Sequence, residues 1–119
     1  MLAACQKADH NGDLGGNWKL LKIEDFAKNE TISTKEIKRF WAIQLNMIAT
    51  STEEDLNHGG KGRFQHVGDS LFVQMIQVPK NAESLGLYNP KDERFEIILL
   101  NNKKMILRSE YALLEFRKF

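Results

Sequence analysis

The chain is poor in the residues that usually carry chemistry. It has one cysteine, two prolines and three histidines, and its 17 basic and 16 acidic residues nearly cancel. A single cysteine excludes an internal disulfide bond. The spacing of His10, His58 and His66 matches no metal-ligand pattern, and no nucleophile elbow, phosphate-binding loop or HExxH motif is present. We therefore expect no enzymatic activity, no metal and no cofactor.

The distribution of charge and of apolar residues sets further limits. Lys and Arg are spread along the chain, whereas binding to nucleic acid requires a concentrated basic face, so we expect no nucleic-acid partner. The longest uncharged run, residues 41–52, is shorter than the roughly 20 apolar residues that a membrane-spanning helix needs. With 119 residues and 42% hydrophobic content, the chain forms one domain with its own core.

The position of the single cysteine is more informative than its number. The segment Leu2-Ala3-Ala4-Cys5 matches a bacterial lipobox, in which small residues precede a cysteine that becomes acylated. Such a signal carries a basic and an apolar segment upstream, and here only Met1 precedes the match. We interpret Cys5 as a lipidation site, residues 1–13 as a tether and residues 14–119 as the folded domain. The alternative is a cytosolic protein with one exposed thiol.

The rest of the chain alternates between short apolar segments and turn residues. This pattern predicts an all-β fold, an antiparallel up-and-down β-barrel of seven to eight strands. The irregular stretch 79–92, with a helical turn around residues 82–85, could add the eighth strand. The seven predicted strands are residues 17–25, 37–50, 62–66, 70–77, 95–100, 104–108 and 111–118.

Residues 37–50 fit two patterns. Ile37, Trp41, Leu45 and Ile48 fall at helical spacing, behind a possible capping box. Strand alternation fits as well, with Trp41, Ile43, Leu45 and Met47 on one face and Ala42, Gln44 and Asn46 on the other. We predict one continuous strand, because the segments that follow are strands and the first of them needs a partner.

Strand alternation assigns one set of apolar side chains to the barrel interior. These residues either fill the barrel or line a pocket for one small ligand. Gln44, Asn46, Gln65 and Gln74 have the opposite parity, and they would line the pocket only if the strand faces were inverted by one residue. The predicted ligand-binding residues are Trp41, Ile43, Leu45, Met47, Phe64, Leu71, Val73, Met75, Phe95 and Ile97, with Leu99 in the same stripe.

The two ends of the barrel sequence predict how it closes. Gly16-Asn17-Trp18 opens the first strand, and Arg117 lies in the last strand. A guanidinium stacked on an indole contributes about 0.5–2 kcal/mol. We therefore predict that Gly16, Trp18 and Arg117 close the barrel, with the Arg117 side chain covering the Trp18 ring.

The sequence resembles a small bacterial lipocalin-like domain of the kind found in lipoproteins of Gram-negative gut bacteria. The resemblance rests on residues 16–20, the 62–71 hairpin and the closing segment 105–119, and it covers most of residues 14–119. It implies an antiparallel barrel, open at one end, that accepts a small apolar molecule. It also implies a lipid-anchored location in the cell envelope, at the outer membrane or the cell surface.

Two functions follow from the sequence. The first is a monomeric, lipid-anchored module that binds a small hydrophobic or amphipathic ligand inside the barrel. The second is a solid barrel that meets a protein partner, or inhibits it, through the long segments 25–35, 50–61 and 78–93, because loops on a rigid scaffold often carry binding.

Overall fold

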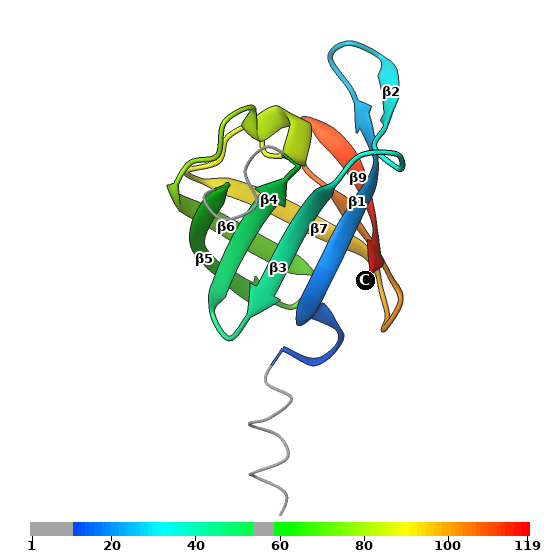
Figure 1. Ribbon diagram of the computed structural model, residues 1–119. Coiled ribbons are helices and arrows are strands. Elements are labelled where there is room, and N and C mark those ends of the chain that lie inside the picture. Colours follow the sequence, from blue (N-terminus) through cyan, green and yellow to red (C-terminus); the bar gives the residue numbers. More distant parts are fainter. Residues whose placement is uncertain (1–10, 54–58) are drawn as a thin grey trace, which may run out of the picture.

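The computed structural model describes residues 11–53 and 59–119, which form β-strands and two short 3₁₀ turns (Figure 1). The predicted all-β class is confirmed. Within these residues, no helix is long and apolar enough to cross a lipid bilayer. The elements are η1 (Gly12–Leu14), β1 (Gly16–Asp25), β2 (Glu30–Ser33), β3 (Arg39–Gln44), β4 (Met47–Thr52), β5 (Gly60–Val67), β6 (Ser70–Gln77), η2 (Ala82–Leu85), β7 (Glu93–Leu100), β8 (Lys104–Arg108) and β9 (Ala112–Lys118).

The strands form a closed barrel. From β3 to β9 each strand pairs antiparallel with the next, and β1 pairs with both β3 and β9. The ring therefore contains eight strands, the higher of the two numbers predicted. The eighth strand is β4 and not, as expected, a strand within residues 79–92. The remaining strand, β2, pairs with the last residues of β1 and projects beyond the ring (Figure 1). We call the end at η1 the lower end and the end at η2 the upper end.

The prediction of one strand over residues 37–50 is wrong in one respect. The segment is extended, but a tight turn at Leu45 and Asn46 divides it into β3 and β4, which pair with each other. Leu45 adopts a φ of +57°, a left-handed conformation that leucine rarely takes. The turn reverses the strand, so the parity predicted for the residues after it does not hold.

Two other turns between neighbouring strands are stabilised in different ways. The β5–β6 hairpin turns at Gly68, whose φ of +59° is the positive value expected of a glycine there. The β7–β8 turn contains Asn101 and Asn102, and neither has a positive φ. Instead, the Asn101 side-chain oxygen accepts hydrogen bonds of 2.8 Å from the amides of Lys103 and Lys104. These side-chain bonds stabilise the turn together with the 3.0 Å hydrogen bond from the Asn101 amide to the Lys104 carbonyl oxygen.

A glycine allows β5 and β6 to approach each other closely. A Cβ atom on Gly62 would lie 2.3 Å from the carbonyl oxygen of Gln74 and 2.7 Å from the Cα of Met75. The register shifts at this point, between Lys61 and Gly62. Only a residue without a side chain fits, and the bulge increases the local twist of the sheet.

Candidate functional site

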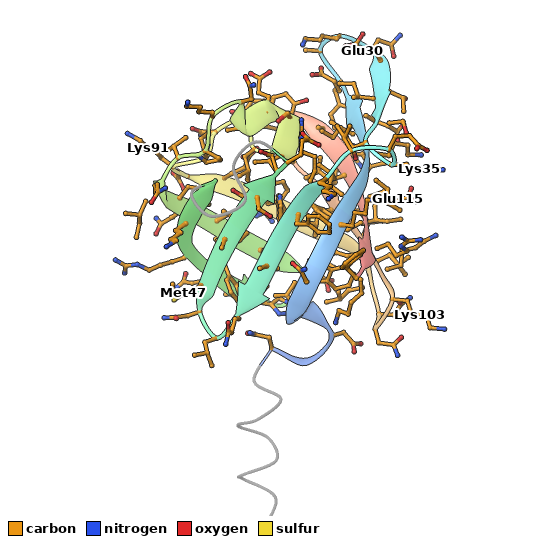
Figure 2. The ribbon with its side chains drawn as sticks, in the orientation of Figure 1. Glu30, Lys35, Met47, Lys91, Lys103 and Glu115 are labelled. Atoms are coloured by element: carbon orange, nitrogen blue, oxygen red, sulfur yellow. The ribbon has the colours of Figure 1, made fainter. Side chains whose placement is uncertain are left out.

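Most of the predicted ligand-binding residues do point into the barrel. The turn at Leu45 excludes two of them: Leu45 is 60% exposed and Met47 is 53% exposed. Figure 2 shows Met47 on the outside of the barrel, near the lower end. Ile97 is half-buried, and Leu99 is exposed because the β7–β8 register shifts between Ile97 and Leu99. The predicted residues that are buried are Trp41, Ile43, Phe64, Leu71, Val73, Met75 and Phe95.

Aromatic side chains fill the interior. The rings of Trp41 and Phe116 have centroids 4.7 Å apart, and those of Trp41 and Phe95 are 5.6 Å apart with an edge-to-face tilt. All three side chains are fully buried, as is Trp18. Aromatic pairs at these distances are in direct contact. The middle of the barrel is therefore occupied by protein atoms.

The lower end is closed by η1. Trp18 Nε1 donates a 2.8 Å hydrogen bond to the carbonyl oxygen of Leu14, whose side chain is fully buried. The cation over the Trp18 ring is Lys118, with its Nζ atom 4.7 Å from the ring centroid. Lys118 Nζ also donates a 2.7 Å hydrogen bond to the carbonyl oxygen of Asp13.

The predicted stacking of Arg117 on Trp18 is wrong. In the β1–β9 register Arg117 lies opposite Lys19, while Lys118 lies opposite Trp18. Arg117 is exposed, because successive residues of a strand point to opposite faces. Gly16 has a φ of +126°, and a Cβ atom there would lie 3.3 Å from the Lys118 side chain. The closing residues are thus Gly16, Trp18 and Lys118. They lie on the first and last strands, β1 and β9, as predicted.

The upper end is closed by η2. Trp41 Nε1 donates a 2.9 Å hydrogen bond to the carbonyl oxygen of Leu85, which is fully buried. Gly86, with a φ of +83°, follows this turn and packs against Leu114 so closely that a Cβ atom would lie 2.5 Å from Leu114 Cδ1. The helical turn predicted around residues 82–85 is confirmed, and it covers the barrel.

A polar cluster links this cover to the barrel wall. The backbone amide of Lys28 and the hydroxyl of Tyr88 both donate to Asp25, and these bonds hold the pKa of its carboxyl below the usual range. Burial, followed by the hydrogen bond to Asp25, raises the pKa of Tyr88. The Tyr88 ring stacks on Tyr111, with centroids 5.6 Å apart.

Glu93 is the buried carboxyl of this region, at only 2% exposure. It accepts hydrogen bonds from the backbone amides of Tyr88 and Asn89, at 3.3 and 3.1 Å. Burial outweighs these two bonds and raises the pKa of Glu93 to about 7. Glu93 therefore joins the segment that follows η2 to the start of β7. Among the residues that the structure describes, no group of three His, Cys, Asp or Glu residues could hold a metal ion.

Two neighbouring cavities open on the outer face of β4, β5 and β6. The larger, of about 550 Å³, is called here the β5–β6 groove, and an adjoining cavity of about 440 Å³ shares Asn46 and Arg63 with it. A third cavity, of about 520 Å³, lies on the outside of β7 and β8 and includes Arg94 and Arg108. The β5–β6 groove is lined by Asn46, Arg63, Phe64, Gln65, Phe72, Gln74 and Asp92.

The fold agrees with a comparison to known protein families. The model of the lipocalin-like domain family matches residues 1–119, the whole chain. The chain belongs to this lipocalin-like family. No curated protein matches the sequence. The family assignment confirms the resemblance that the sequence indicated.

Two crystal structures from Bacteroides share the fold. A lipocalin-like protein from Bacteroides uniformis superposes with a TM-score of 0.72 and 19% identity, over 91% of this chain and 100% of that chain. An uncharacterized protein from Bacteroides eggerthii gives a TM-score of 0.67 and 17% identity, over 88% and 98%. At these identities the likeness establishes the fold alone, and the lipocalin-like fold suggests ligand binding.

Two residues of these sites were missed from the sequence. Lys118 has the same parity as Phe116, so placing Phe116 inside the barrel would have assigned the closing cation to Lys118. Phe72 was not among the predicted site residues. Its position beside Gln65 depends on the β5–β6 register, which alternation alone does not specify.

Proposed function

We propose that this lipocalin-like chain is a non-enzymatic binding module that recognises its ligand on the outside of a filled barrel. The observation that carries the proposal is the packed interior, with contacting aromatic rings in the middle and an indole-bound 3₁₀ turn at each end. The outer wall, by contrast, has cavities of about 440 and 550 Å³. Ligand sites generally have volumes of roughly 300–1,000 Å³.

A titration with an environment-sensitive apolar fluorophore tests this proposal. We expect no saturable binding to the native protein. Leu107→Ala, at a fully buried position, serves as the positive control, because a cavity lined by apolar groups binds small apolar molecules. Ile48→Ala is a second control if Leu107→Ala does not fold. Saturable uptake by the native protein would contradict recognition on the outside.

A small apolar ligand inside the barrel is the second candidate. One observation favours it: the Thr50 hydroxyl is buried and has no hydrogen-bond partner within the described part of the chain. A ligand atom under η2 would satisfy this hydroxyl, since buried polar groups are nearly always hydrogen-bonded. The same titration separates the candidates, because a ligand inside the barrel would also change the fluorescence of the buried Trp41.

We also propose that Cys5 carries a lipid and attaches the module to the cell envelope of a Gram-negative bacterium. Cys5 and the rest of residues 1–10 lie outside the described residues. Support comes from the lipobox match and from η1, which begins the described part of the chain at the lower end of the barrel. Metabolic labelling with a palmitate analogue tests it, using the gene with its upstream coding region. The native protein should be labelled and Cys5→Ala should not, and equal labelling of the two contradicts the anchor.

A further inference from the structure

Three of the four amide residues noted in the sequence, Asn46, Gln65 and Gln74, lie together on one outer face of the barrel. Gln65 and Gln74 point outward, and both line the β5–β6 groove. The register places Arg63 opposite Gln74 and Gln65 opposite Phe72. Side chains that are directly opposite on one face of an antiparallel pair are close enough to act on the same ligand. Asn46 adds a third amide from the β3–β4 turn.

These polar groups are available to a ligand. Within residues 11–53 and 59–119, the structure gives the side chains of Arg63, Gln65 and Gln74 no hydrogen bond or ion pair. Each amide offers two donor hydrogens and one acceptor oxygen, the guanidinium donates, and the Asp92 carboxylate accepts. The groove thus presents donors and acceptors side by side around one cavity.

The groove also contains an exposed aromatic surface. Phe72 is 37% exposed on the outer face of β6, between Gln65 on β5 and Arg94 on β7. A pyranose sugar matches this arrangement, because its edge carries hydroxyls that both donate and accept and its ring face is apolar C–H surface. From this match we propose that the β5–β6 groove binds a neutral oligosaccharide, with a sugar ring against Phe72 and its hydroxyls on Gln65, Gln74 and Asn46.

The charges of the groove favour a neutral ligand. Its walls carry one guanidinium, Arg63, and one carboxylate, Asp92, and the adjoining cavity adds Lys61, whereas a nucleic-acid strand needs several cations along its phosphates. The adjoining cavity of about 440 Å³ continues the site past Met47 and Ile76. A chain of several sugar units can therefore lie across β4, β5 and β6. This inference rests on the proposed recognition at the outer face.

Titrations followed by amide NMR spectra test the proposal, with cellohexaose, maltohexaose, xylohexaose and mannohexaose as the named sugars. We expect saturable shifts for at least one hexasaccharide, confined to β4, β5 and β6. Phe72→Ala should weaken binding about tenfold or more, and Gln74→Ala about three- to tenfold, as loss of one hydrogen bond implies. Gln44→Ala, an exposed amide outside the groove, and Phe26→Ala, an exposed aromatic on the β1–β2 hairpin, should bind like the native protein.

Three results would overturn the proposal. They are the absence of saturable shifts with all four sugars, binding that both groove variants retain, and tighter binding of a hexauridylate than of any sugar. Unfolding of Phe72→Ala leaves the test intact, because Gln74→Ala changes an exposed side chain. If the sugars do not bind and the native protein also excludes the apolar fluorophore, the oligosaccharide proposal alone fails. Uptake of the fluorophore by the native protein contradicts the outer-face function itself.

Discussion

The Trp41 indole nitrogen donates a 2.9 Å hydrogen bond to the carbonyl oxygen of Leu85, 44 residues later in the chain. This bond joins the barrel wall to the turn that covers its upper end. Both side chains are fully buried, so the carbonyl oxygen has no access to solvent if the bond is lost. We therefore expect this bond to contribute to keeping the upper end closed, together with the packing of Gly86 on Leu114.

Trp41→Phe tests this closure. The substitution keeps an aromatic ring but removes the donor, and we expect a loss of about 2–4 kcal/mol in the free energy of unfolding. Limited proteolysis should cleave residues 82–88 faster than in the native protein. Phe95→Leu is the control, because it removes core volume and leaves the Leu85 bond in place. Equal protection of residues 82–88 in Trp41→Phe and the native protein would show that the bond does not hold the turn.

Lys118→Ala tests closure at the lower end. The change removes the cation over Trp18 and the hydrogen bond to Asp13, and we expect it to cost about 1–2 kcal/mol. Arg117→Ala is the matched control, at the next position of the same strand but exposed, and should change stability by less than about 0.5 kcal/mol. Thermal unfolding measures both. A larger loss in Arg117→Ala would restore the guanidinium as the closing group.

Glu93 predicts a specific pH dependence of stability. Its pKa is about 7 in the folded protein, against an ordinary value of 4.5. Between these values the folded state holds a proton that the unfolded chain releases, so stability falls as the pH rises from about 4.5 to 7. Asp25 acts in the opposite sense in acid: its pKa is lowered, and its contribution is lost as the pH falls through its folded pKa.

Urea unfolding at a series of pH values measures this effect. Glu93→Gln should flatten the stability curve between pH 5 and 7, because glutamine does not titrate. Asp25→Asn should leave that slope unchanged. It should remove only the loss of stability that occurs in acid, as the pH falls through the folded pKa of Asp25. An unchanged slope between pH 5 and 7 in Glu93→Gln would mean that Glu93 does not cause it.

Leu45→Asn should stabilise the protein. Leu45 has a φ of +57° and is 60% exposed, so its side chain contributes little packing while its backbone conformation is unfavourable. Asparagine tolerates this conformation, and we expect a gain of about 1 kcal/mol, seen as a higher melting temperature. Met47→Asn, at an exposed position without a positive φ, should bring no gain. A lower melting temperature for Leu45→Asn would mean that the leucine side chain is needed.

Alternation in the sequence predicted the central part of the barrel. Phe64, Leu71, Val73, Met75 and Phe95 were assigned to the interior, and all are buried. The physical reason is that β5, β6 and the start of β7 face solvent on one side and the core on the other. Their side chains must therefore alternate in polarity.

The errors arise where the backbone leaves this regular pattern. The turn at Leu45 has no glycine, and a leucine in the left-handed region has no recognisable sequence signature, so the reversal before Met47 was missed. Likewise, the bonds from Trp18 to Leu14 and from Trp41 to Leu85 are tertiary contacts that end the barrel. Without them, the sequence alone left open whether the interior was a pocket or a packed core.

The β1–β9 seam brings the C-terminal residue beside the first strand. The amide of Phe119 donates a 2.8 Å hydrogen bond to the carbonyl oxygen of Asn17. The start of β1 and the C-terminal residue therefore lie close together at the lower end of the barrel. A short linker that joined them would leave every strand pair intact. A circularly permuted protein whose chain is opened at Gly68 would keep the same strand pairs in the barrel. Its new termini would lie at the ends of β5 and β6.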